Sequence, residues 1–119
     1  MIFDRYEHLS EDAQRLLCFF VDTGLGSEKR MDEHIYLLTQ YCFTAFDGQS
    51  ALEELLREGI LKHEGKDWYA NMPRYGIHDA DFVPALWYLY ECRKDLLLSF
   101  RKFHQMGGTQ YRSVRYAVK

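Results

Sequence analysis

The sequence predicts a mainly helical fold that carries one small β-hairpin, an α+β class. Apolar residues recur at intervals of three and four positions in several segments, the spacing that places them on one face of an α-helix. Near the middle of the chain, one such segment ends at Gly59, and two short runs, ILKH and WYANM, follow it. Their β-branched and aromatic residues are typical of paired strands. Because two strands alone are marginally stable, we expect the hairpin to pack on the helix before it.

The composition indicates a single soluble domain. The chain has 119 residues, 47% of them hydrophobic and 28% charged, and this length can build one core without metal ions or disulfides. Its cysteines, Cys18, Cys42 and Cys92, are odd in number and far apart, which favours a reducing compartment. No apolar run approaches the roughly 20 residues of a membrane span, and residues 1–15 do not resemble a signal peptide. We therefore expect a cytoplasmic protein with no membrane association.

Charge is distributed unevenly along the chain. Residues 1–92 carry 8 basic against 17 acidic side chains, whereas residues 93–119 carry 7 against 1. A basic segment behind an acidic body can bind a nucleic acid or an acidic protein, or it can fold back on its own body. We expect one domain over residues 1–105, with a core at 9–72, a helical extension at 79–105 and then a basic tail at 106–119. The tail lacks a helical period and is predicted to be either disordered or a terminal strand.

The first core helix is predicted to begin after Ser10, whose hydroxyl can cap it, and to end at Gly24. Its apolar positions follow the pattern of a core-facing helix and are Ala13, Leu16, Leu17, Phe20 and Val21. A second helix is predicted to begin near Met31. Its apolar residues are Ile35, Leu37, Leu38 and Tyr41.

The third helix is predicted to begin after Asp47, whose carboxylate can accept hydrogen bonds from the free amides of the first turn. Its apolar face consists of Ala51, Leu52, Leu55 and Leu56. Gly59 can adopt the left-handed conformation that closes a helix. The run from Cys42 to Phe46 is too apolar for a solvated loop, so we interpret it as a buried connection into this helix.

A fourth helix is predicted after Asp79 or Asp81, with Pro84 tolerated in its first turn because those amides have no intrahelical partner. From Phe82 to Tyr90 it is apolar around nearly its whole circumference. One small core cannot surround such a helix, so part of its surface is expected to contact a second chain or domain. The candidate interface residues are Trp87, Tyr88 and Tyr90. In the alternative interpretation, the tyrosine hydroxyls reach water while their rings lie on the core.

A last helix is predicted to begin at Asp95, its cap, and to end at Gly107 and Gly108. Its inward residues are expected to be Leu96, Leu97, Phe100 and Phe103. Its outward residues are expected to be Arg101, Lys102 and His104.

The segment LEELLREGILKHEGKDWYAN, preceded by two predicted helices, resembles a winged helix, a variant of the helix-turn-helix. The resemblance covers the chain roughly from Leu9 to Met72 and implies a three-helix core with a hairpin wing. It also implies contact with duplex DNA through the third helix. Appended C-terminal helices form a dimer in many winged-helix regulators, and the helix from Phe82 to Tyr90 is similar to these in position and character.

The third helix itself does not favour DNA binding, because groove binding needs cations that face the phosphates. Its predicted outward positions hold three carboxylates and one guanidinium and are Gln49, Ser50, Glu53, Glu54, Arg57 and Glu58. We therefore expect a non-enzymatic module for protein association or homodimerisation. The alternative is a DNA-binding transcriptional regulator that contacts nucleic acid through its basic C-terminal segment. The candidate contacts are then Arg101, Lys102, Arg112 and Arg115.

The sequence does not indicate an enzyme. Its five histidines are scattered, and no Cys-x-x-Cys motif occurs. His78, Asp79 and Asp81 form the one tight cluster of potential metal ligands, and helix capping accounts for the two aspartates. A third hypothesis, an enzyme site between the hairpin and the aromatic helix, would use Trp68, Tyr75, His78 and Trp87, but nothing there is arranged as acid, base and nucleophile. We therefore expect no catalytic, cofactor-binding or metal-binding residues.

Overall fold

Seven elements of secondary structure make up the described part of the chain. The computed structural model describes residues 3–22, 43, 45–66 and 73–103. In chain order the elements are α1 (Asp4–Glu7), α2 (Glu11–Asp22), α4 (Gly48–Arg57), β1 (Leu61–Lys66), β2 (Pro73–Ile77), α5 (Asp79–Cys92) and α6 (Lys94–Phe103). The fold is mainly helical with one two-stranded antiparallel sheet, so the predicted class is confirmed. The helix predicted near Met31 and the tail at 106–119 lie outside the described residues.

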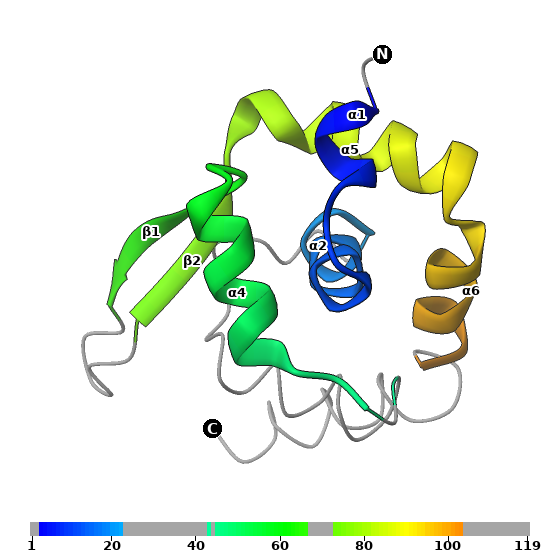
Figure 1. Ribbon diagram of the computed structural model, residues 1–119, viewed down its shortest axis with the longest axis horizontal. Helices are drawn as coiled ribbons and strands as arrows, with labels where there is room; N and C mark the ends of the chain where they lie inside the picture. The colour runs from blue at the N-terminus through cyan, green and yellow to red at the C-terminus, as the bar shows by residue number, and fades with distance from the viewer. Residues whose placement is uncertain (1–2, 23–42, 44, 67–72, 104–119) are drawn as a thin grey trace, which may run out of the picture.

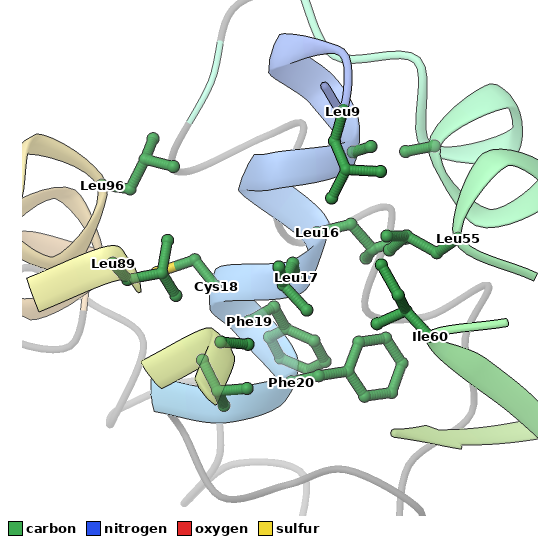
Figure 2. Close-up of a cluster of buried hydrophobic side chains, with 14 of the residues drawn as sticks. Leu9, Leu16, Leu17, Cys18, Phe19, Phe20, Leu55, Ile60, Leu89 and Leu96 are labelled. Atoms are coloured by element: carbon green, nitrogen blue, oxygen red, sulfur yellow. The ribbon is translucent and has the colours of Figure 1, made fainter. Parts of the chain in front are cut away.

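Helix α2 lies at the centre of the molecule, and α4, α5, α6 and β2 pack around it (Figure 1). Its residues 16–21 are all buried, although they point to all sides of the helix. Figure 2 shows how this burial is achieved. Leu55 and Ile60 approach α2 from one side, and Leu89 and Leu96 approach it from the other. The helix that is covered on all sides over residues 16–21 is therefore α2, and among the described elements α4, α5, α6 and the hairpin contribute to this burial.

The N-terminal end of α2 is bonded to α4 at two places, at the N-cap of α4 and in its last turn. Ser10 caps α2 as predicted, because its Oγ accepts a hydrogen bond from the Ala13 amide at 3.1 Å. Glu54 of α4 accepts two further bonds, from the Ser10 amide at 2.8 Å and the Ser10 hydroxyl at 2.6 Å. Asp12 of α2 accepts a bond from the Asp47 amide at 3.0 Å. Glu54 is therefore engaged within the fold, contrary to its predicted place on the outward face of the third helix.

Helix α4 begins and ends where the sequence predicts. Asp47 accepts a hydrogen bond from the Ser50 amide at 3.0 Å, and this bonding lowers the pKa of its carboxyl group. The chain leaves the helix at Gly59 with a φ of 74°, a left-handed conformation that glycine adopts without steric strain. Of the predicted buried connection from Cys42 to Phe46, Phe43 and Phe46 are buried, Ala45 is exposed, and residues 42 and 44 lie outside the described part.

The returning strand of the hairpin lies further along the chain than predicted. Strand β1 pairs antiparallel with β2, and Leu61 lies opposite Ile77. The described strand that pairs with β1 is β2, which begins at Pro73, whereas the sequence predicts a returning strand at 68–72, a segment that lies outside the described residues. The proline and glycine of PRYGI weaken the strand pattern in the sequence. Proline is nevertheless tolerated at the first position of a strand, which is where it occurs here.

The starts of α5 and α6 differ from their predicted caps. His78 is the N-cap residue of α5, so Asp79 and Asp81 lie inside its first turn rather than capping it. Negative charges in this turn are still favourable, because the helix dipole is positive there. Pro84 consequently lies in the second turn, where it removes one backbone hydrogen bond of the helix. Asp95 likewise lies within the first turn of α6 and is not its cap.

Helix α6 packs on α2 and α5. Leu96 and Leu97 are buried in the contact, as predicted. The other two predicted core residues, Phe100 and Phe103, belong to the helix, but their side chains lie outside the described part of the structure. The C-terminal extension thus contributes to the same hydrophobic core that surrounds α2.

Candidate functional site

The exposed face of α5 is the most apolar surface among the described residues. Four large hydrophobic side chains are exposed in this part of the chain, and three of them, Val83 at 56%, Trp87 at 57% and Tyr90 at 42%, lie on α5. Together with the half-buried Leu86 they occupy positions i, i+3, i+4 and i+7, which share one face of a helix. We call Val83, Leu86, Trp87 and Tyr90 the α5 stripe. Its side chains, with Glu91 beside them, line an open hollow of about 400 Å³.

The opposite face of α5 is buried against α1, α2 and α6. Its buried residues are Asp81, Ala85, Tyr88 and Leu89. Tyr88 was a predicted interface residue, but it is only 3% exposed, so that assignment is wrong. The reason is helical geometry. Successive residues of an α-helix point about 100° apart, so Tyr88 turns toward the core while Trp87 turns toward solvent.

The hydroxyl of Tyr88 is satisfied inside the protein. It donates a hydrogen bond to Gln14 Oε1 at 2.8 Å, and Gln14 Nε2 donates in turn to the Leu9 carbonyl at 3.1 Å. The Tyr88 ring packs against Phe3 and Tyr6, with ring centroids 5.7 and 5.8 Å away. Burial raises the pKa of the Tyr88 hydroxyl. The predicted alternative, in which the tyrosine hydroxyl reaches water, therefore does not hold for this residue.

A buried carboxylate fixes the N-terminal end of α5. Asp81 accepts hydrogen bonds from the Tyr6 hydroxyl at 2.7 Å and from Arg5 Nε at 2.9 Å. Arg5 Nη2 also donates to the carbonyl of Glu58, the C-cap residue of α4, at 3.1 Å. Burial and the bond to Asp81 raise the pKa of the Tyr6 hydroxyl well above its usual range. These contacts tie α1, α4 and α5 together at one point.

An arginine fixes the C-terminal end of α5. Arg93 forms two hydrogen bonds with the Glu11 carboxylate, Nη1 to Oε1 at 2.9 Å and Nη2 to Oε2 at 2.7 Å. It also binds both carboxylate oxygens of Asp95, from Nε at 3.0 Å and from Nη2 at 2.9 Å. A further bond runs from Nη1 to Gln14 Oε1 at 2.8 Å. The bonds from Arg93 lower the pKa of the Glu11 and Asp95 carboxyls.

Sequence reasoning did not find the residues that fix α5, because their partners lie far away in the chain. Arg5 and Asp81 are 76 positions apart, and Glu11 and Arg93 are 82 apart. No local motif marks such pairs. The sequence offers only the residue type as a signal. An aspartate or an arginine that becomes buried between helices needs a partner of opposite charge, but the sequence does not show which residue that partner is.

The α5 stripe is an apolar surface on a helix whose two ends are fixed by the hydrogen bonds of Asp81 and Arg93. The stripe contains no charged group, and its two aromatic residues are of the kind enriched among residues that dominate binding energy at protein interfaces. Tyrosine and tryptophan combine a large apolar area with a polar atom that can still reach water at the edge of a contact. The chemistry of this site is therefore that of a contact surface.

The side chains of the four predicted basic contacts lie outside the described part of the structure. Arg101 and Lys102 lie within α6, but their side chains are outside the described part, and Arg112 and Arg115 are outside it altogether. Arg93, which opens the basic segment, is occupied by Glu11 and Asp95. On α4, the predicted outward residues other than Glu54 are exposed, so this face presents two carboxylates and one guanidinium instead of the expected three and one.

The potential metal ligands at the start of α5 do not converge on a site. Among the described residues, no three His, Cys, Asp or Glu side chains are grouped so that they could hold a metal ion. Asp81 instead bonds with Arg5 and Tyr6. Within the same part of the chain, every helix is too short or too polar to span a lipid bilayer.

Among the described residues, the fold defines a small, mainly helical module that exposes the α5 stripe on a helix fixed at both ends by hydrogen bonds. No protein-family model, curated protein or solved structure matches this chain. The function must therefore be inferred from the chemistry of the stripe itself.

Proposed function

We propose that the chain is a non-enzymatic protein-association module and that the α5 stripe is its binding surface. In this proposal α2, the helix expected near Met31, α4 and the hairpin form a winged-helix-like core. Helices α5 and α6 are the appended C-terminal extension. The α5 stripe takes the place of the predicted interface set, with Trp87 and Tyr90 kept and Tyr88 replaced by Val83 and Leu86.

One observation carries the proposal. Val83, Trp87 and Tyr90 are each more than 40% exposed on a helix whose opposite face is buried in the core. Leaving large apolar side chains in water is unfavourable by roughly 25 cal/mol for each Å² that a partner would cover. The bonds of Asp81 and Arg93 at the two ends of α5 prevent the helix from turning this face inward. A partner chain that covers the stripe would relieve this exposure.

Binding that depends on the stripe tests the proposal. The full chain, immobilised, would be used to recover partners from a cell extract, beside a Trp87→Asp variant and a Leu98→Asp control. Leu98 is 59% exposed on α6 and does not line the hollow, so it matches Trp87 in exposure but not in position. We expect a partner that is retained by the wild type and the control and lost with Trp87→Asp. Equal recovery by all three proteins would refute the proposal.

The alternative is nucleic-acid binding through the basic segment. It is favoured by the charge of residues 93–119, which carry 7 basic and 1 acidic side chain. It ranks second because Arg93 is already neutralised by two carboxylates and the exposed face of α4 is acidic. Titration with duplex and single-stranded DNA at low and physiological salt tests it. Affinity that falls steeply with salt, and that is lost when Arg112 and Arg115 become Ala, would support this alternative.

A further inference from the structure

We propose that the partner of the α5 stripe is an amphipathic helix of another protein, with cations at both ends of its apolar face. This inference rests on the proposed function and adds the chemistry of the partner to it. Two features of α5 carry it. The first is a pair of carboxylates at the ends of the stripe, and the second is the helical backbone beneath the stripe.

An exposed carboxylate lies at each end of the α5 stripe. Asp79 is four positions before Val83, and Glu91 is four positions after Trp87, so helical spacing places both beside the stripe. Glu91 also lines the hollow. Neither carboxylate forms a hydrogen bond or an ion pair with another residue that the structure describes. The two are about 18 Å apart along the helix axis, at roughly 1.5 Å per residue.

The cations near α5 do not neutralise these two carboxylates. Arg5 and Arg93 are each bonded to other carboxylates within the fold. Lys94 is exposed, but it belongs to α6, beyond the C-cap residue of α5, and it does not line the hollow. The stripe is therefore an apolar surface whose two ends are acidic.

The charge at the ends selects among the classes of partner that an apolar stripe can bind. Nucleic acids and anionic lipid surfaces would bring negative charge toward Asp79 and Glu91 and would be repelled. A second copy of α5 would also be repelled. A parallel pair brings like ends together, and an antiparallel pair brings the Asp79 end of each helix beside the Glu91 end of the other. A partner with cations at the corresponding positions is instead attracted at both ends.

The backbone of α5 favours a helical partner over an extended one. Within α5 the backbone amides and carbonyls bond with one another, so the stripe offers no strand edge. The buried backbone groups of an extended segment would lack partners on this surface, which is unfavourable. A helix bonds its own backbone groups and presents only side chains, as when an amphipathic helix docks in an apolar groove. The apolar side chains of such a helix would enter the hollow that the stripe lines.

The length of α5 limits the size of the contact. The helix has 14 residues, so it is about 21 Å long. A partner helix of about four turns spans the stripe and carries its two cations roughly 11 or 12 positions apart. A contact along one such helix buries less than the roughly 1,200 Å² below which complexes are weak and transient. We therefore expect micromolar affinity, with a contribution from the charges that decreases as salt is added.

A pair of designed peptides tests the proposal on the full chain. Both are helices of about 16 residues with leucines on one face over the central turns. One peptide has a lysine on that face a turn beyond each end of the leucines, and the other has glutamate at the same two positions. Fluorescence anisotropy measures their binding. We expect the lysine peptide to bind roughly tenfold more tightly at low salt, because each end changes from repulsion to attraction, and the ratio to shrink at high salt.

Variants of the chain test whether the peptide binds at the stripe. Trp87→Ala should weaken binding of the lysine peptide by roughly tenfold or more, because large aromatic side chains dominate such contacts. Leu98→Ala removes a similarly exposed apolar side chain from α6 and should leave binding unchanged. The double variant Asp79→Lys, Glu91→Lys should prefer the glutamate peptide. Circular dichroism would first check that each variant folds like the wild type.

Three results with these peptides would overturn the inference. They are no binding of the lysine peptide at its highest soluble concentration, equal affinity for the two peptides at low salt, and an unchanged preference in the double variant. If a partner is still recovered from the cell extract in a manner that depends on Trp87, the proposed function stands and only this inference fails. If that recovery is absent as well, both fail. A dimer of the chain that dissociates in Trp87→Asp would also overturn the inference, because a second copy would then cover the stripe.

Discussion

Arg93 and Glu11 are 82 positions apart in the sequence and meet through two hydrogen bonds of 2.9 and 2.7 Å between the guanidinium and the carboxylate. The pair joins the first turn of α2 to the junction of α5 and α6. Its Arg93 side chain is only 16% exposed, so water competes weakly for the arginine. Because Asp95 and Gln14 bond with the same guanidinium, this one side chain connects three helices.

Replacing Arg93 should therefore destabilise the whole domain. In Arg93→Met the chain keeps most of the side-chain volume but loses five hydrogen bonds to three residues. We expect the free energy of unfolding to fall by about 1–3 kcal/mol, less than for a fully buried pair because the two carboxylates can turn to water. Urea denaturation measures this change. Arg57→Met, which removes an exposed arginine from α4, is the control and should have an effect within about 0.5 kcal/mol.

The same pair predicts how stability depends on pH. The hydrogen bonds from Arg93 hold the folded pKa values of Glu11 and Asp95 below the ordinary values of these groups, 4.5 and 3.8. A group with a lowered folded pKa contributes stability that is complete above its unfolded pKa and is lost as the pH falls through its folded pKa. We therefore expect the loss to begin below a pH of about 4.5 and to continue at lower pH. Comparing unfolding free energies of the wild type and Arg93→Met between pH 7 and 3 isolates this contribution. An equal loss in both proteins would show that the pair does not cause it.

The buried Asp81 offers a second test of the contacts that hold α5. In Asp81→Ala the Tyr6 hydroxyl and the Arg5 guanidinium both lose their charged acceptor. We expect a destabilisation of about 2–4 kcal/mol, because one partner of a largely buried cluster is removed. Asp79→Ala, two residues earlier and exposed, is the matched control and should change the unfolding free energy by at most about 0.5 kcal/mol. Similar effects of the two substitutions would contradict the different roles assigned to these aspartates.

Substitution of two neighbouring aromatic residues of α5, Trp87 and Tyr88, should change the stability by very different amounts. Tyr88→Ala removes a buried ring and its bond to Gln14, and we expect a loss of about 3–5 kcal/mol in unfolding free energy. Trp87→Ala removes an exposed ring and should change the stability of the monomer by about 1 kcal/mol or less. Thermal or urea denaturation at a concentration below that of any dimer measures both. The reverse order would mean that the other face of α5 is the buried one.

The predictions that agree with the structure are those that depend on local contacts. Ser10 and Asp47 are capping residues as expected, because a cap bonds with amides only three positions away. Gly59 ends α4 as expected, because glycine adopts the left-handed backbone conformation without strain, whatever structure follows it. Strand propensity did not identify the described partner of β1, because the pairing of Leu61 with Ile77 depends on tertiary packing and not on the β-propensity of PRYGI alone.

The sequence by itself determined the helical class, the ends of α4 and the presence of an apolar helix between Asp79 and Cys92, because each of these is encoded within a few turns of chain. Only the tertiary structure decided which face of that helix is exposed. Tyr88 and Trp87 are equally apolar in the sequence, and the difference between them comes from α1 and α2, which cover one side of α5 and leave the other in solvent. Residues more than 70 positions away supply those contacts, and no periodicity within α5 can specify them.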